Sequence, residues 1–256
     1  MSAAIIIPAR YASTRLPGKP LLAETGKPLI QYTYEQAMKS KRASQVVVAT
    51  DDARIKAMVE GFGGAVMMTR EGHDTGSARA AEAAGALDAD IIVNLQGDEP
   101  EIDPAHIDRV IELAAKHDAF AATLVCAFPP EARAGHGSPD DPSAVKAILG
   151  KRLEGDAFEV RYFTRHICPY PRAPDGAISH PEKYYLHLGI YAFAKENLLT
   201  FAQTPPGVLE RAEKLEQLRI LEASGRIVAG CVSAATPGID TRSDYDAFVR
   251  RQAARR

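Results

Sequence analysis

Short hydrophobic runs alternate with helix-length segments along the first half of the chain. Runs with the composition of buried strands occur at residues 4–8, 45–50, 64–68, 90–96 and 120–128. The segments between them have the spacing of helices, at residues 28–40, 52–61, 75–87 and 104–117. This alternation predicts an α/β fold in which helices flank a mainly parallel sheet.

The second half of the chain has a mixed pattern. Residues 129–145 are rich in Pro, Gly and Asp, which predicts a connection over the surface. One amphipathic helix is predicted at residues 207–225, ending at Gly225. Further strands are predicted at residues 157–163, 185–193 and 226–232. We therefore expect a single domain over residues 1–256, with an elaborated second half.

The charges nearly cancel, with 31 basic and 33 acidic residues among 256 and a formal net charge of -2. Such a balance indicates neither a nucleic-acid partner nor a membrane surface. The apolar run near the N-terminus is far too short to span a membrane. Cys126, Cys168 and Cys231 are far apart and lack the spacing of metal ligands, so we expect reduced thiols in a cytoplasmic protein.

Three cations follow the first predicted strand, in the segment "PARYASTRLPGKPL" at residues 8–21. Ligands of open α/β sheets bind beyond the carboxyl ends of the strands, and Arg10, Arg15 and Lys19 fall in such a loop. Guanidinium and ammonium groups spaced by small residues suit a polyphosphate. A solvated basic loop is the alternative. The segment contains neither a Walker A motif nor the glycine fingerprint of dinucleotide binding.

Carboxylates follow two other predicted strands. Asp98 lies in "NLQGDEP" at residues 94–100, and Asp240 lies in "PGIDTRSDYDAF" before a predicted helix. Mg²⁺ prefers oxygen ligands and often binds through one or two carboxylates together with substrate phosphates. Both residues are therefore candidate Mg²⁺ ligands. The alternatives are a simple turn at Gly97-Asp98 and a helix N-cap at Asp240.

These segments, together with "VVVATDD", "KYYLHLGIYAF" and "LERAEKLEQLRILEASGRI", resemble the 3-deoxy-manno-octulosonate cytidylyltransferase (CMP-Kdo synthetase) family. The matches run in order from residue 4 to about residue 248. The resemblance implies a nucleotide-diphospho-sugar transferase fold, with a Rossmann-like, mainly parallel sheet flanked by helices and a mixed second half. It also implies transfer of CMP from CTP to Kdo with Mg²⁺ and release of pyrophosphate, for lipopolysaccharide or capsule biosynthesis. A homodimer formed through residues 150–195, roughly, is implied as well.

Site residues carried over from the resemblance fall into four groups. Arg10, Lys19 and Asp98 are expected to be catalytic, and Asp98 and Asp240 to hold the metal. The nucleotide is expected to contact Pro8, Ala9, Arg10, Arg15, Lys19, Thr75, Gly76, Ser77, Arg79 and Gln96. The sugar is expected to contact Arg165, His187, Tyr191, Glu213, Glu216 and Gln217.

The sugar residues are the least specific of these expectations. Kdo is a carboxylated sugar, and Arg165 could grip its carboxylate through two parallel hydrogen bonds. Glu213 and Gln217 would share one face of the predicted helix, and Glu216 would lie beside them. A structural role for His187 and solvated roles for both glutamates are the alternatives.

One segment departs from the family pattern. Residues 74–82, "DTGSARAAE", carry the two hydroxyls as Thr75 and Ser77 in exchanged order, and Ala78 replaces an acid. The change is neutral if the acid faces solvent, or it alters the acceptor sugar or the fit of the nucleotide. Two other activities stay open. One is cytidylyl transfer to a related ulosonic acid, such as 8-amino-Kdo or a sialic-acid-like sugar. The other is nucleotide binding without catalysis, although the retained cations and carboxylates argue against that role.

Overall fold

Two units divide the chain in the structure, a computed structural model that describes residues 1–13, 15–173 and 176–255. The first unit comprises Met1–Ile111, Ala194–Ala202 and Thr236–Arg256. The second unit comprises Glu112–Phe193 and Gln203–Ala235. The single domain expected over residues 1–256 stays a prediction.

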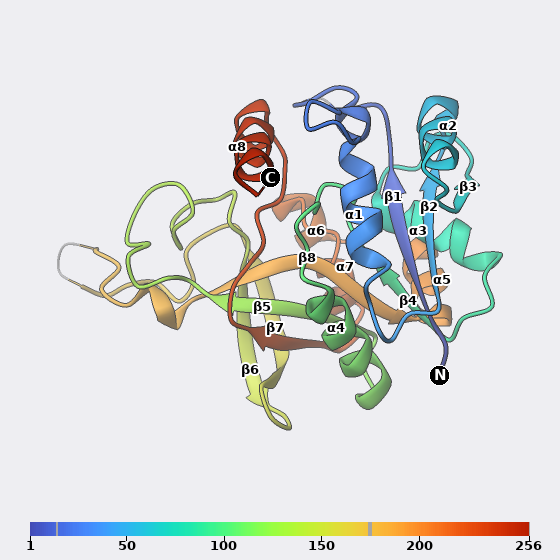
Figure 1. The fold of residues 1–256 in the computed structure, drawn as a ribbon. Coiled ribbons are helices and arrows are strands. Elements are labelled where there is room, and N and C mark those ends of the chain that lie inside the picture. Colours follow the sequence, from blue (N-terminus) through green and yellow to red (C-terminus); the bar gives the residue numbers. More distant parts are fainter. Residues whose placement is uncertain (14, 174–175, 256) are drawn as a thin grey trace. The chain divides into compact units, whose positions relative to one another are not determined.

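A parallel sheet forms the centre of the first unit, as predicted (Figure 1). Its strands are ordered β3 (Val66–Met68), β2 (Gln45–Thr50), β1 (Ala3–Ala9) and β4 (Ile91–Asn94). Every residue of β1 is buried. Continuous burial is expected of a central parallel strand, because helices cover both faces of such a sheet.

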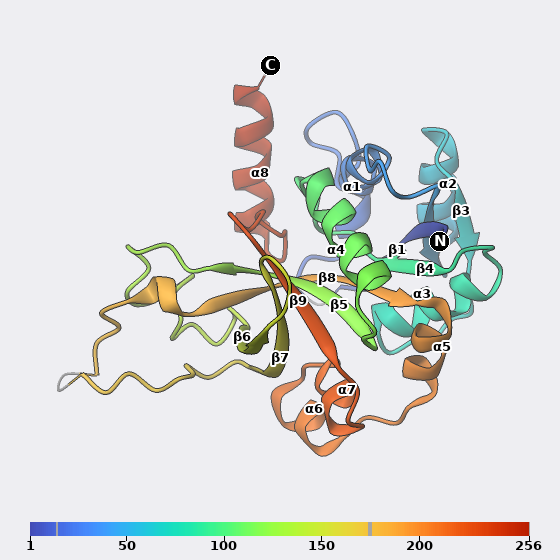
Figure 2. The ribbon, with the colours of Figure 1, turned by 90° about the horizontal axis from the view of Figure 1, so that it is seen from below.

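Helices of the first unit cover this sheet on its two sides, and Figure 2 shows α1 and α3 on opposite sides of β1. Their starts follow from local capping. The Asp52 side chain accepts a hydrogen bond from the Arg54 N–H, and the Thr75 hydroxyl accepts one from the Ala78 N–H. The helical segments are η1 (Lys19–Leu21), α1 (Leu29–Ala37), α2 (Ala53–Gly61), α3 (Gly76–Gly85) and α8 (Arg242–Ala254).

A hydrophobic cluster joins the C-terminal helix α8 to the N-terminal segments of the first unit. Its buried members are Leu16, Leu29, Ile239, Tyr245 and Phe248. Ile239 directly precedes Asp240, so burying this isoleucine fixes the backbone next to a candidate metal ligand.

The second unit has a mixed sheet, again as predicted. Its strands are ordered β8 (Tyr185–Ala194), β5 (Ala121–Ala127), β9 (Ile227–Val232), β7 (Ala157–Thr164) and β6 (Lys146–Arg152). β5 pairs in parallel with β9 and antiparallel with β8, and β7 is antiparallel to both of its neighbours. The 3₁₀ helix η2 (Pro181–Lys183) precedes β8.

The helix predicted at residues 207–225 is wrong. The structure has two short helices there, α6 (Val208–Glu213) and α7 (Leu218–Glu222). Lys214 ends α6 in the left-handed conformation, with φ of 54°, and its N–H donates to the Glu210 carbonyl. A left-handed residue cannot continue a right-handed helix, so Glu213 and Gln217 do not share one helical face.

Two further elements, β6 and α5 (Lys195–Gln203), were not predicted. Strand β6 has a short apolar core between lysines and a glycine, which is weak evidence for a strand. Helix α5 buries Leu198 and Phe201, a spacing of three residues that indicates a helix. Helix α4 (Pro104–Lys116), in contrast, matches its prediction closely.

None of the helices in the described residues is both long enough and apolar enough to cross a lipid bilayer.

Replacing Lys214 with Gly should stabilise the protein by about 0.5–1 kcal/mol, because glycine adopts positive φ without the steric cost of a Cβ. The free energy of unfolding from urea titrations checks this. Ala212→Gly is the matched control within α6, and it should destabilise the protein by roughly 1 kcal/mol. Equal destabilisation by both changes would show that the left-handed turn at Lys214 is not the native conformation.

Candidate active site

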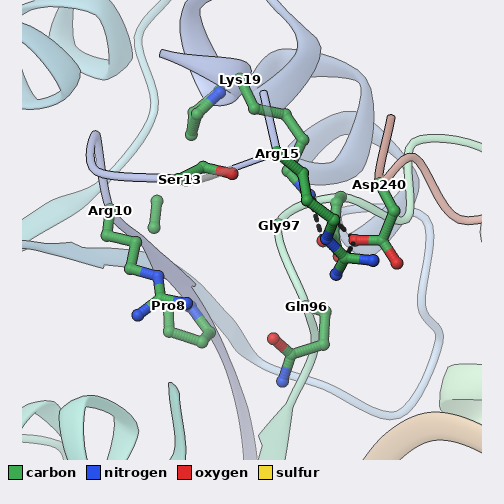
Figure 3. A pocket seen from close by; sticks show the side chains of 11 residues that line it. Pro8, Arg10, Ser13, Arg15, Lys19, Gln96, Gly97 and Asp240 are labelled. Carbon is green, nitrogen blue, oxygen red and sulfur yellow. Dashed lines mark hydrogen bonds and ion pairs between the residues drawn. The ribbon is translucent and has the colours of Figure 1, made fainter. Parts of the chain in front are cut away.

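A cavity opens where β1 and β4 end in the first unit (Figure 3). The two strands pair in parallel, with Ile6 opposite Asn94, so the segments that follow them leave the sheet at the same edge. The lining residues are Pro8, Ala9, Arg10, Ser13, Arg15, Lys19, Pro20, Gln96, Gly97, Asp98 and Asp240. The basic loop and both candidate metal ligands therefore meet in one place.

Gly18 gives the basic loop its turn. Its φ of 67° lies in the left-handed region, and its N–H donates to the Tyr11 carbonyl over 3.1 Å. A Cβ at Gly18 would lie 3.2 Å from the Tyr11 ring, whose other neighbour is the Arg54 guanidinium, 3.4 Å from the ring centroid. Both the backbone angle and the close approach of the ring favour glycine here. Lys19 follows directly and begins η1.

The Lys19 ammonium lies close to both candidate metal ligands, Asp98 and Asp240. Its Nζ lies 2.6 Å from Asp98 Oδ2, 2.6 Å from the Ile239 carbonyl oxygen and 3.6 Å from Asp240 Oδ1. Arg15 also binds Asp240, at 3.0 Å between NH2 and Oδ1, as Figure 3 shows. Asp98 and Asp240 therefore converge on one cation from segments far apart in sequence.

Arg10 differs from the other two cations of the loop. It is exposed, and it makes no hydrogen bond or ion pair with any residue that the structure describes. Its side chain lies beside Pro8 in Figure 3, away from the carboxylates. Arg10 is thus the cation of this loop that is free to bind an added anion.

A neighbouring cavity contains most of the other predicted nucleotide residues. It is lined by Pro8, Ala9, Arg10, His73, Thr75, Gly76, Arg79 and Gln96. Gly76 allows a close approach here, because a Cβ would lie 3.2 Å from the Pro8 ring and 3.5 Å from the Gln96 amide. The two cavities share Pro8, Ala9, Arg10 and Gln96, so they lie side by side and together make the candidate nucleotide site.

The side chains of Ser77 and Arg79 form hydrogen bonds with other residues of the first unit. The buried Ser77 hydroxyl accepts a hydrogen bond from the Asn94 amide over 2.9 Å. Arg79 donates to Asp51 and to the Thr69 hydroxyl, both over 2.5 Å. Ser77 lines neither cavity, whereas Arg79 presents part of its side chain to one of them.

His73 was not predicted. Its side chain is only 3% exposed and lines the nucleotide cavity, and Nε2 lies 2.5 Å from Glu82 Oε2. Burial acts to raise the pKa of Glu82, but hydrogen bonds from the Arg70 N–H and from His73 lower it below its usual value. An ionised Glu82 accepts a hydrogen bond from the Nε2–H of His73, and this bond fixes the tautomer of the histidine. The segment "GHDTG" could have drawn attention to His73.

Glu99 is a third acid near the two candidate metal ligands, Asp98 and Asp240. Burial raises the pKa of Glu99 to about 8, and the nearby carboxylates of Asp98 and Asp240 add to the rise. Its Oε2 accepts a hydrogen bond from the Thr236 hydroxyl over 3.3 Å. Sequence alone does not distinguish the role of Glu99 from that of Asp98, since the two acids are adjacent.

The arrangement suits Mg²⁺. Asp98 and Asp240 are oxygen donors that face one point, which the Lys19 contacts define. Across the described ranges, no group of three or more His, Cys, Asp or Glu side chains is arranged to hold a metal. A site with two carboxylates still fits Mg²⁺, because this ion commonly completes its octahedron with substrate phosphates and water.

Two candidate sugar residues lie together in the second unit. His187 Nε2 is 3.1 Å from the Thr123 hydroxyl, and the ring centroid is 4.8 Å from that of Phe163 and 5.3 Å from that of Tyr191. This enclosure lowers the pKa of His187 to about 3. Burial, with a contribution from Glu216, raises the pKa of Tyr191. The Tyr191 hydroxyl is buried without a hydrogen-bond partner among the described residues, so a ligand could bind it.

The side chains of Arg165 and Glu213 each hydrogen-bond the backbone of the other residue. Glu213 accepts from the Thr164 hydroxyl over 2.7 Å and from the Arg165 N–H over 2.9 Å. The Arg165 guanidinium donates to the carbonyls of Glu213 and Pro142, over 2.8 and 3.1 Å. These contacts give both side chains a structural role, and their sugar contacts stay predictions. Gln217 is buried at the start of α7.

The chain matches a known family over most of its length. Residues 4–227 match the Cytidylyltransferase family. The chain belongs to this family. Among solved structures, that of CMP:2-keto-3-deoxy-manno-octonic acid synthetase complexed with CTP is 37% identical, with a TM-score of 0.87 and full coverage of both chains. The nucleotide-diphospho-sugar transferase fold expected of this cytidylyltransferase is thereby confirmed.

Curated relatives of this cytidylyltransferase carry two related names. The 3-deoxy-manno-octulosonate cytidylyltransferase of Rhodopirellula baltica is 45% identical, with 98% of each chain covered. The 8-amino-3,8-dideoxy-manno-octulosonate cytidylyltransferase of Shewanella halifaxensis is 41% identical, with 95% of this chain and 96% of the relative covered. The two identities are so close that they do not show which of the two sugars this cytidylyltransferase accepts.

The buried His187 should make this cytidylyltransferase sensitive to acid. In the native protein the ring stays neutral down to about pH 3, whereas an unfolded histidine binds a proton near pH 6.5. The unfolded state therefore binds more protons in this window, and the free energy of unfolding should fall as pH drops from about 6.5 toward 3. Urea unfolding across this range should show a shallower loss in His187→Gln, by up to a few kcal/mol.

The exposed His166 provides the control for this measurement. His166→Gln should leave the pH dependence as in the parent protein. If His187→Gln and the parent lose stability in parallel below pH 6.5, the ring is not held neutral in the folded state.

Proposed function

We propose that the protein is a 3-deoxy-manno-octulosonate cytidylyltransferase, which transfers CMP from CTP to Kdo and releases pyrophosphate. The observation that carries this proposal is the full-length likeness, at 37% identity, to a synthetase complexed with CTP. The geometry supports it independently, because one cavity combines Arg10, Lys19 and a pair of carboxylates. Cations and metal-binding carboxylates are the groups that phosphoryl chemistry needs.

The reaction exchanges one oxygen substituent on phosphorus for another. The anomeric oxygen of Kdo attacks the α-phosphorus of CTP, the bond from that phosphorus to the bridging oxygen breaks, and the hydroxyl proton leaves to solvent. Arg10 and Lys19 would bind the β- and γ-phosphates and stabilise the charge that develops on the pyrophosphate. Arg15, now paired with Asp240, would add a third positive charge beside the triphosphate. Most of the rate would come from this positioning and electrostatic stabilisation.

Asp98 and Asp240 would hold Mg²⁺. When bound, the ion would neutralise phosphate charge and polarise the α-phosphoryl group. Unpaired, the two negatively charged carboxylates would repel the triphosphate. Their ion pairs with Lys19 and Arg15 reduce that repulsion.

The nucleotide and the sugar would use separate residue sets. Gln96, Thr75, Gly76 and Arg79 would surround the nucleoside portion of CTP in the cavity next to Arg10. On the sugar side, the unpaired Tyr191 hydroxyl and the enclosed His187 would hydrogen-bond Kdo. The guanidinium of Arg165, with Glu213, Glu216 and Gln217, is proposed to contact the acid sugar as well.

Two alternatives remain for the acceptor and the activity. Transfer to the 8-amino relative of Kdo is favoured by the Shewanella enzyme, which is 41% identical over nearly the whole chain. Nucleotide binding without catalysis keeps the same cations but would release no pyrophosphate. A cytoplasmic homodimer that serves lipopolysaccharide or capsule synthesis is proposed from the family resemblance alone.

Pyrophosphate release tests the proposed function directly. The purified protein with Mg²⁺ and each of CTP, UTP, ATP and GTP should release pyrophosphate with CTP and Kdo, and at least tenfold more slowly with the other nucleotides. Release with 8-amino-Kdo alone would support the alternative acceptor. Binding of CTP with no release for any sugar would exclude a transferase.

Arg10→Ala should weaken binding of CTP much more than binding of CMP. The free guanidinium faces the proposed phosphate tail, and one charge-assisted hydrogen bond contributes roughly 1.5–3 kcal/mol, so CTP affinity should fall about ten- to a hundredfold. Calorimetric titration of each nucleotide checks this. Lys27→Ala is the control, since Lys27 pairs with Glu35 in the same unit. Equal loss of CTP and CMP affinity would mean that Arg10 does not bind the phosphate tail.

A further inference from the structure

The segment from Thr236 to Asp240 is attached to the loop that carries Asp98. The Ile239 N–H donates to the Asp98 carbonyl over 2.9 Å, and the Ile239 carbonyl accepts from Lys19 over 2.6 Å. The Ile239 side chain is buried in the cluster that includes Leu16. These contacts fix the segment near its C-terminal end, next to Asp240.

Glu99 fixes the other end of the same segment. Its Oε2 accepts from the Thr236 hydroxyl over 3.3 Å. Its Oε1 faces Gly238, since a Cβ added at this glycine would lie 3.1 Å from that oxygen. One carboxyl group therefore hydrogen-bonds Thr236 and lies close to Gly238, the residues on either side of Pro237.

This placement of Glu99 is electrostatically unfavourable. Burial, together with the nearby Asp98 and Asp240 carboxylates, raises the pKa of Glu99 to about 8. The Lys19 ammonium pairs with Asp98 and Asp240, whereas Glu99 forms no ion pair with any cation that the structure describes. The contacts that Glu99 makes with the segment are therefore its evident contribution.

We propose that Glu99 is a positioning residue for the metal-binding pair: by holding Thr236 and Gly238, it fixes the start of the segment whose end carries Asp240, and so sets where Asp240 lies relative to Asp98. The proposal rests on the proposed function for its consequence in catalysis. The seating of the segment itself depends on no ligand.

Hydrogen exchange tests the seating without any substrate. In Glu99→Ala, the Ile239 amide, which donates to Asp98, should exchange about five- to tenfold faster, as the loss of one ordinary hydrogen bond implies. Glu99→Gln should restore slow exchange, because its amide oxygen still accepts from Thr236. Thr236→Val removes the hydroxyl alone and should resemble Glu99→Ala. It also provides a second test if Glu99→Ala does not fold.

Glu101 provides the matched control. It is the next acid along the chain, and its carboxylate binds Arg251 and Arg255 near the far end of α8. Glu101→Gln should leave exchange at Ile239 as in the parent. Unchanged exchange in both Glu99→Ala and Thr236→Val would overturn the proposal, as would a Glu99→Gln variant that exchanges as fast as Glu99→Ala.

The metal dependence of pyrophosphate release tests the consequence for the site. The Mg²⁺ concentration for half-maximal activity should rise about tenfold in Glu99→Ala and stay at the parent value in Glu99→Gln and Glu101→Gln. Faster exchange in Glu99→Ala with an unchanged Mg²⁺ requirement would overturn the proposal. It would show that the way Glu99 holds the segment does not determine where Asp240 lies relative to Asp98. An inactive parent protein would exclude the proposed function, while the exchange measurement would still decide the seating.

Discussion

The Nζ of Lys19 holds together three segments that are far apart in the chain. It lies 2.6 Å from both Asp98 and the Ile239 carbonyl, and the Lys19 and Asp98 side chains are only 13% and 30% exposed. A charge pair this sheltered is screened less than a surface pair. Without the ammonium, Asp98 and Asp240 would repel each other and the segment carrying Asp240 would lose an anchor. The position of Lys19 in turn depends on Gly18, whose left-handed turn leads the loop back to the sheet edge.

The sheet topology explains why these segments can meet. β1 and β4 are adjacent parallel strands, so the basic loop after β1 and the acidic loop after β4 begin at the same edge. Gly97 allows the two loops to approach, since a Cβ there would lie 3.3 Å from the Pro8 carbonyl oxygen. The same edge thus brings the cations proposed to bind a triphosphate beside the carboxylates proposed to bind a metal. A fixed arrangement of this kind favours phosphoryl transfer, because little reorganisation is needed as charge develops.

The parts of the fold with strong local signals were predicted well from the sequence. Continuous apolar runs predicted β1, β2 and β4, and the polar residues that follow β1 and β4 predicted the cavity. The helix predicted at 207–225 was wrong because Lys214 adopts a left-handed conformation that its residue type does not favour. Glu99, His73 and the inward orientation of Arg79 were not foreseen, since each depends on contacts with distant residues such as Thr236, Glu82 and Asp51. Spacing along the chain carries no information on such pairs.

Asp98 and Asp240 are proposed to bind a metal together with the triphosphate that Lys19 and Arg10 hold. Calorimetric titration of CTP into the protein with and without Mg²⁺, in the absence of sugar, tests this arrangement. We expect Mg²⁺ to strengthen CTP binding about tenfold or more in the parent and in Asp246→Asn, whose carboxylate binds Arg242 instead. In Asp98→Asn the effect of Mg²⁺ should vanish, while CTP alone should bind at least as tightly as in the parent because one repulsive charge is gone. An Asp98→Asn variant that keeps the full Mg²⁺ effect would contradict this account of the site.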